Sequence, residues 1–252
     1  MKYTQDIPWY KNDYLVYPFN KEESLHYIFN FQKNSLAEKN IKEIVKLKEE
    51  HHLKILSFLE LDNNRKIDYY IYSSIQEKNL LMGDDSPGNA IWEELENNNP
   101  KKFEIHVVYN EKCRFIGEHE DTHLLSLPWG LSIYLFCEGL AQYMENTFLN
   151  RNLHLVTKEL MEKGKTYSID FLCKNNNWEH VEPTIIYPQV GSFIKYLIEY
   201  YDKENFKRVY QNTSREKEIT ENLLEIEKIY QKNINQLEKE WLLFLKKNNT
   251  IT

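Results

Sequence analysis

Two histidines and a glutamate stand at a spacing that suits zinc chemistry. Residues 119–123 read His-Glu-Asp-Thr-His, an HExxH pattern. Residues four apart share one face of a helix, so His119 and His123 could each direct a nitrogen at a single Zn²⁺, at about 2.0–2.1 Å. Glu120 projects about 100° around the helix from His119, where its carboxylate could accept a proton from a water that attacks a carbonyl. The pattern predicts a zinc-dependent hydrolase.

A catalytic zinc usually has three protein ligands and one position left for water, so the pattern needs a third ligand. Glu138 follows in a second helical segment, and we expect it to be that ligand. Glu145, close to the same helical face, is the alternative. Gln142 lies one turn beyond Glu138 and could orient a ligand through its amide. We expect Asp121, the additional carboxylate of the first helix, to point away from the metal.

These segments resemble the gluzincin metallopeptidases, specifically the peptidase MA-like family. The matching stretches are HEDTH at 119–123, EGLA at 138–141, YPQVGSFIKYL at 187–197 and LEKEWLLFL at 237–245. The resemblance implies a zincin-like fold and a zinc metallopeptidase with one Zn²⁺ per chain, held by His119, His123 and Glu138. It also implies hydrolysis of peptide bonds in a peptide or protein substrate, with Glu120 as general base. The interval from His123 to Glu138 is shorter than in the best-known gluzincins.

The resemblance further implies a hydrogen-bond donor for the oxyanion of the tetrahedral intermediate. In aminopeptidase-type gluzincins a tyrosine just before a glycine-containing helix start donates this bond. Tyr187 stands in the corresponding place ahead of Gly191, with a gap one residue longer than in some relatives. Other gluzincins use a histidine, so His180 is the alternative donor.

Each of these residues also has a purely structural interpretation. The two histidines can be ordinary helix residues, Glu138 a solvated charge and Tyr187 a ring packed at a helix entrance. The alternative function is then a non-catalytic, gluzincin-fold binding or interaction protein. The intact HExxH pattern argues against that alternative, because nothing in it is visibly inactivated. A toxin-like effector peptidase acting on one host protein is a third possibility, which no residue selects.

The elements that must position these residues differ between the two halves of the chain. In the first 110 residues, β-prone or alternating runs at 13–18, 66–72 and 103–109 predict strands, and we expect the last two to share one small sheet. Apolar residues at helical spacing predict helices at 21–33 and 35–61, and the residues at 83–88 predict a loop. If the strand at 103–109 lies at the sheet edge, its backbone could pair with an extended peptide.

Beyond residue 117 the apolar spacing predicts helices almost throughout. They are expected at 118–126, 131–148, 154–163, 190–201, 203–211 and 216–246. The fold class is therefore α+β: a small mixed-sheet lobe at 1–117, then a mainly α-helical lobe at 118–252 that carries the HExxH helix and the third-ligand glutamate.

Composition excludes several classes of function. A net charge of -7 gives no field that would draw the chain to nucleic acid, and no apolar run is long enough to span a membrane. Three cysteines without CxxC spacing argue against a disulfide framework. The first twenty residues lack a signal-peptide core, so we expect a cytoplasmic protein as the chain is written, and a secreted one if a leader was removed. The abundance of Lys, Asn and Ile is typical of an AT-rich genome, such as a bacterial one.

Several other side chains are interpreted as structural. We expect His51 and His52 to face solvent on a charged helix, and His106 to lie on the surface of the sheet. Cys137 is expected to pack as a small hydrophobic residue, and Trp241, on the last helix, to belong to the core.

Overall fold

The computed structural model describes residues 13–63, 65–93 and 102–247. They form two compact units, one ending at Leu125 and the other starting at Ser126. The first is mixed α and β, and the second is almost entirely helical, so the chain has an α+β fold. The HExxH helix is the last element of the first unit, whereas the predicted boundary preceded it, at residue 117.

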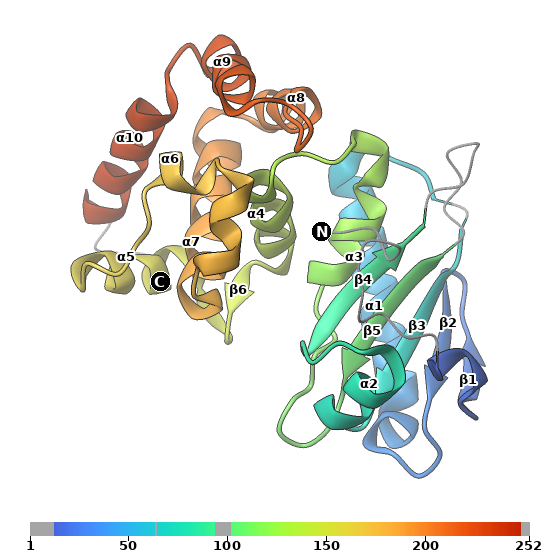
Figure 1. Ribbon diagram of the computed structural model, residues 1–252. Coiled ribbons are helices and arrows are strands. Elements are labelled where there is room, and N and C mark those ends of the chain that lie inside the picture. The colour runs from blue at the N-terminus through green and yellow to red at the C-terminus, as the bar shows by residue number, and fades with distance from the viewer. Residues whose placement is uncertain (1–12, 64, 94–101, 248–252) are drawn as a thin grey trace. The chain divides into compact units, whose positions relative to one another are not determined.

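A five-stranded sheet forms the centre of the first unit (Figure 1), with the strand order β1-β2-β3-β5-β4. Its strands are β1 (Asn20–Glu23), β2 (Tyr27–Phe31), β3 (Ile67–Tyr72), β4 (Gly88–Trp92) and β5 (Phe103–Val108). Strands β2, β3 and β5 run parallel, whereas β1 and β4 are antiparallel to their neighbours. The prediction that β3 and β5 share one sheet is confirmed, because they are adjacent.

The strand β5 is not an edge strand. It pairs with β3 on one side and with β4 on the other, so its backbone donors and acceptors are already used by the sheet. The idea that an extended peptide could add to this strand is therefore wrong. Ile105 at the middle of β5 illustrates this double pairing. It lies opposite Tyr69 of β3 on one side and opposite Ala90 of β4 on the other.

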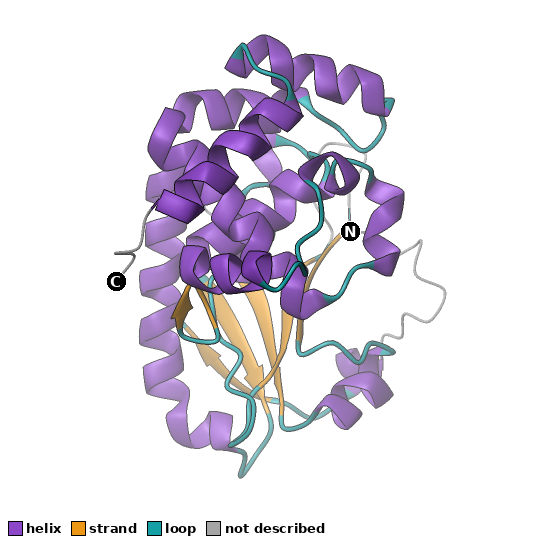
Figure 2. Cartoon of the chain, turned by 90° about the vertical axis from the view of Figure 1, so that its left-hand side faces the viewer, coloured by secondary structure: helices purple, strands orange, loops and turns teal. Residues whose placement is uncertain are grey.

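Helices cover both faces of the sheet (Figures 1 and 2). The long helix α1 (Leu36–Leu59) lies along one face and the short helix α2 (Ile75–Met82) along the other. The predicted helix at 35–61 is thus confirmed as α1; Ser35 caps it by accepting a hydrogen bond from the Glu38 backbone, and Glu60 ends it in a left-handed conformation.

Two predictions near the N-terminus are wrong. Residues 21–33 form the β1–β2 hairpin instead of a helix, because β2 gains a parallel partner in β3, and such pairing outweighs weak helical spacing. Residues Asp13–Val16 form a 3-10 helix instead of a strand, and its Tyr14 packs in a buried cluster with Tyr72, Met82 and Ile91. The sequence interpretation also missed α2 and β4.

The second unit is built from helices that mostly match the prediction. They are α4 (Tyr134–Glu145), α5 (Leu153–Glu162), α6 (Ile169–Leu172), α7 (Pro183–Tyr196), α8 (Lys203–Asn212), α9 (Ile219–Tyr230) and α10 (Ile234–Lys247), with a short hairpin of β6 (Thr147–Phe148) and β7 (Arg151–Asn152). The predicted helix 190–201 in fact begins at Pro183, which suits a first helical position, and its last residues form a π-helix. The predicted helix 216–246 is interrupted at Gln231, which is left-handed.

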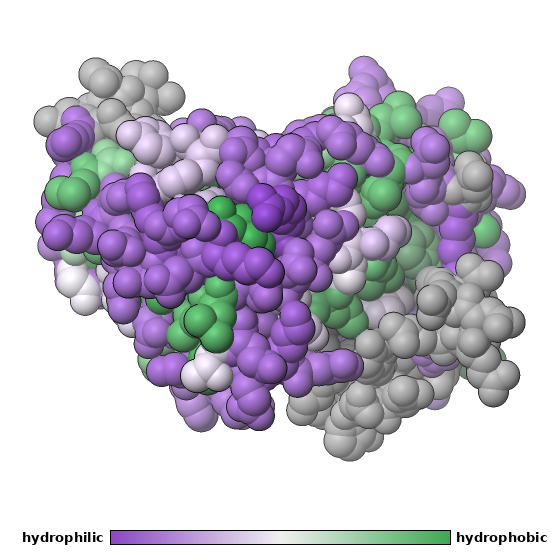
Figure 3. Space-filling view, turned by 90° about the horizontal axis from the view of Figure 1, so that it is seen from above, coloured by the Kyte–Doolittle hydropathy of each residue, from purple (hydrophilic) through white to green (hydrophobic). Residues whose placement is uncertain are grey.

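Among the residues that the structure describes, the exposed large apolar side chains are spread over many elements. In the face shown in Figure 3, hydrophilic residues predominate and hydrophobic ones gather in small groups. Within the part of the chain that the structure describes, no helix combines the length and the apolar character needed to cross a membrane.

Candidate metal centre

The helix α3 (His119–Leu125) carries the HExxH residues, and every one of its residues is buried. Its first turn is held from the preceding residue, since both the backbone N–H and the hydroxyl of Thr122 donate to the Glu118 carbonyl, at 2.9 and 2.8 Å. The rings of His119 and His123 lie 4.9 Å apart between centroids, at 75°. Helical spacing thus brings the two imidazoles together, as the sequence predicts.

Glu138 completes a group that could hold a metal ion. One ligand atom from each of His119, His123 and Glu138 lies within 4.8 Å of the others, and all three residues are buried. Two imidazole nitrogens and a carboxylate oxygen are the donor types that zinc takes in catalytic sites. This buried donor set therefore fits a divalent cation.

The alternative ligand Glu145 is not a member of this group. It is half-buried, and its Oε2 accepts a hydrogen bond of 3.2 Å from the Gln142 amide. The same amide nitrogen donates to the Thr147 carbonyl at 2.7 Å. Gln142 therefore links the end of α4 to β6, and its role in orienting a metal ligand stays a prediction.

Close backbone packing positions α4, which carries Glu138. A Cβ atom on Gly139 would lie 2.2 Å from Ile194 Cγ1 and 3.2 Å from the Val190 carbonyl oxygen, both on α7. A Cβ on Gly191 of α7 would lie 2.6 Å from Gln142 Cγ of α4. The two helices approach so closely that only glycine fits at each contact.

Asp121 points away from its histidine neighbours, as expected. Its side chain is fully buried and forms an ion pair with Lys48 of α1, while the hydroxyl of Tyr27 in β2 donates to Oδ1 at 2.8 Å. Sequence inspection missed Lys48, although a signal was present: it lies four residues from Ile44 and four from His52, on the stripe of α1 that is buried.

Arg215 is a second residue that the sequence did not single out. Its Nε donates to the Ser132 carbonyl at 3.0 Å, and its guanidinium lies 4.1 Å from the centroid of the Tyr134 ring. Burial opposes charge on this group, but electrostatic interactions with Cys137, Tyr134 and Glu138 raise the pKa of Arg215. A permanent cation therefore lies in the surroundings of the candidate ligand Glu138. No sequence motif marks it, because only the fold brings the segment after α8 to α4.

The two candidate oxyanion donors occupy different settings. Tyr187 is half-buried inside α7, four residues after its first residue and directly before Pro188, so it does not precede the helix start as the resemblance implied. The reason is that Pro183 starts α7 seven residues earlier than predicted. His180 is exposed at the end of a 3-10 helix, Asn175–His180. The role of either residue stays a prediction.

The remaining histidines correct the sequence interpretation. His52 is fully buried and His51 half-buried, because α1 turns this side towards the sheet, so the prediction that they face solvent is wrong. His106 is also fully buried, hydrogen bonded to the Tyr72 hydroxyl at 2.9 Å and to Glu104 at 3.2 Å. The rings of Tyr14 and Tyr70 pack against it, with centroids 4.7 and 4.8 Å away, so it does not lie on an open sheet face.

Two further structural interpretations are confirmed. Trp241 is fully buried, and its indole N–H donates to the Ser192 hydroxyl at 3.1 Å. Cys137 is buried, and its thiol donates to the Ser132 carbonyl at 3.3 Å. All three cysteines of the chain are free thiols.

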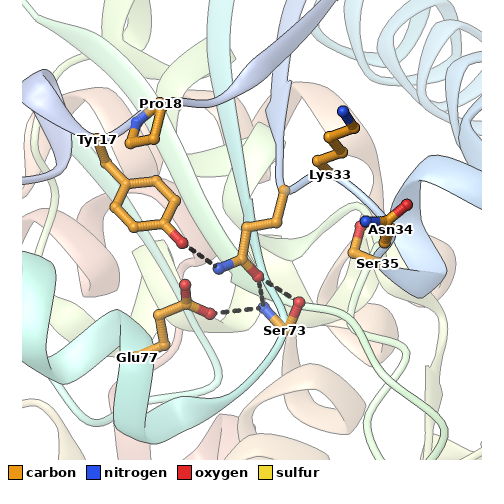
Figure 4. Close-up of a pocket in the computed structure, with 8 residues that line it drawn as sticks. Tyr17, Pro18, Lys33, Asn34, Ser35, Ser73 and Glu77 are labelled. Atoms are coloured by element: carbon orange, nitrogen blue, oxygen red, sulfur yellow. Dashed lines mark hydrogen bonds between the residues drawn. The ribbon is translucent and has the colours of Figure 1, made fainter.

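A polar cavity of about 390 Å³ lies in the first unit, where β2 leads into α1 and β3 leads into α2 (Figure 4). Its polar groups are largely bonded to one another: Gln32 donates to the Tyr17 hydroxyl at 2.9 Å and accepts from the Ser73 N–H at 3.0 Å. Burial and the neighbouring Glu77 raise the pKa of Tyr17. The cavity contains none of the candidate metal ligands.

Comparison with known proteins does not identify a family for this chain. No protein-family model matches the chain, and a search of curated proteins finds no match either. The functional assignment therefore depends on the side chains of the candidate metal centre.

Proposed function

We propose that the protein is a zinc-dependent metallopeptidase of the gluzincin type. The observation that carries this proposal is the buried group of His119, His123 and Glu138, whose ligand atoms lie within 4.8 Å of one another. The first two come from an HExxH helix and the third from a later helix, which is the arrangement that the resemblance implies.

The chain's own residues would each take one task in this reaction. His119, His123 and Glu138 would hold the ion, which when bound lowers the pKa of a water to about 7 and polarises a carbonyl. Glu120, next to the first ligand and also buried, would accept the proton of the attacking water. Tyr187, or alternatively His180, would donate to the oxyanion.

Metal analysis of the purified protein tests the proposal first. We expect close to one zinc per chain, and a Glu138→Gln variant that binds zinc at least about tenfold more weakly, because a neutral amide is a poorer ligand. Glu145→Gln, on the same helix, is the matched control and should retain the metal. A folded wild-type protein that takes up no zinc would contradict the proposal.

Activity on a peptide library tests the chemistry separately. Glu120→Gln should keep its zinc and lose hydrolysis by a factor of about 10² or more, because the general base is gone. A wild-type protein that binds zinc but cleaves no peptide would favour the non-catalytic alternative. Cleavage that persists in the Glu120→Gln variant would assign the base to another residue.

A further inference from the structure

We infer that Lys48, Asp121 and Tyr27 form a buried anchor that sets the position of the metal-binding helix, and that they act as positioning residues for His119 and His123. The inference rests on the proposed metal function. Its physical basis, however, lies wholly in contacts within the first unit, between α3, α1 and β2.

Lys48 of the anchor contacts the chain on both sides of His119. The Lys48 ammonium pairs with Asp121, two residues after that histidine, and also donates to the Gly117 carbonyl at 3.1 Å, two residues before it. The same ammonium lies 4.8 Å from the centroid of the Tyr69 ring. A single cation thus fixes the backbone ahead of the helix and a side chain in its first turn. Rotation or sliding of the short helix would break both contacts.

Tyr27 completes the anchor from the sheet. Its hydroxyl donates to Asp121 Oδ1 at 2.8 Å, so the two carboxylate oxygens have separate partners, one on a strand and one on a helix. Burial, then the charge of Asp121 and the hydrogen bond to it, raise the pKa of Tyr27 well above its usual range. The phenol therefore remains a donor, and Asp121 is held in one orientation.

Stability alone is a poor explanation for such an anchor. Removing two charges from water costs free energy, and well-packed apolar residues of similar volume often support a fold equally well. What the charged pair adds is directionality: it favours one placement of α3, and hence of the imidazole nitrogens. Metal ligands need that placement to a few tenths of an ångström, and loss of the groups that orient them typically costs about 10–100-fold in metal affinity.

The test uses the full chain and zinc competition with a chromophoric chelator. The triple variant Tyr27→Phe, Lys48→Met and Asp121→Leu replaces the whole anchor with apolar side chains and leaves no unpaired charge. We expect its metal-free form to unfold at a temperature close to that of the wild type, but its zinc affinity to fall by about 10–100-fold. The visible absorption of the Co²⁺-loaded protein should also change, since it reports ligand geometry.

Two further variants make the result decisive. Tyr27→Phe alone removes one hydroxyl and should weaken zinc binding by about three- to tenfold, so it serves if the triple variant does not fold. Tyr14→Phe removes a buried hydrogen bond to Glu104 on the opposite face of the sheet, at 2.8 Å, and should leave zinc affinity unchanged. Wild-type affinity in folded Tyr27→Phe and triple variants would overturn the inference while leaving the metal site intact. A wild type without zinc affinity would overturn both.

Discussion

The two helices that carry the candidate ligands are held by different forces. In the first unit, α3 is tied down by buried charge, through the pairing of Asp121 with Lys48 and the hydrogen bond from Tyr27. In the second unit, α4 is held by direct backbone approach to α7, through Gly139 and Gly191. Hydrogen bonds between charged groups fix orientation, whereas glycine contacts fix distance.

This difference suits the ligands that each helix supplies. The helix α3 supplies two imidazoles from one short segment, so the rotation of the helix about its own axis decides where both rings point. A directional anchor such as a charged hydrogen bond restricts that rotation. The helix α4 supplies one flexible carboxylate, so its distance from the neighbouring helix matters more than its exact rotation. The two anchors should therefore fail in different ways when they are altered.

The largest effect is expected from breaking the charged anchor on one side only. Asp121→Asn leaves the Lys48 ammonium buried without its carboxylate, which should lower the free energy of unfolding by about 3–5 kcal/mol. Urea denaturation measures this change. The matched control is Lys54→Met, which breaks a pair with Glu118 in which Lys54 is 49% exposed; it should cost less than about 1 kcal/mol. Equal losses in the two variants would show that burial of the first pair is unimportant.

Each unit also contains a buried histidine that should make stability depend on pH. Burial lowers the pKa of His52 to about 4, with the neighbouring charges of His26 and Lys48 acting in the same direction and Glu49 opposing them. Burial, followed by the charge of Lys195, lowers the pKa of His154 to about 4 as well. Between pH 6.5 and 4 the unfolded chain binds a proton at each histidine and the folded chain does not, so stability falls as the pH falls.

At pH 5 each histidine should cost about 2 kcal/mol relative to pH 7, from a shift of the order of 2.5 pKa units. Thermal unfolding from pH 7 to pH 5 measures the loss. His154→Gln should remove the part of this stability loss that arises in the second unit. His52→Gln should remove the part that arises in the first unit, so each variant should show a weaker dependence of stability on pH. A profile that keeps its full slope in both variants would assign the dependence to other groups.

The smallest effect is expected at the glycine contact. Gly139→Ala places a methyl group against Ile194 and the Val190 carbonyl, and overpacking of this kind typically costs about 1–3 kcal/mol. Alanine's higher helix propensity returns about 1 kcal/mol, which leaves a net loss of about 0–2 kcal/mol. Thermal unfolding measures it. Adding Ile194→Ala should make the combined loss smaller than the sum of the two single losses, because the overlap is relieved; strict additivity would refute the contact.

Prediction from the sequence was most accurate where one segment sufficed. The HExxH spacing placed His119 and His123 together, and strong apolar periodicity identified α1. It was wrong where a partner decided the outcome: residues 21–33 became a hairpin because β3 pairs with β2. Prediction from the sequence also missed the role of Lys48. A lysine on an apolar stripe can be recognised as buried only when its buried partner, Asp121, is known.

The sequence by itself determined the division into a mixed α and β first half and a mainly helical second half, the helical pairing of two histidines and the availability of a downstream glutamate. Only the tertiary structure brought Glu138 together with those histidines, placed Lys48 beneath Asp121 and buried His52 and His106. The reason is physical: periodicity reflects forces between residues a few positions apart, whereas burial and ion pairing depend on which distant segments come into contact.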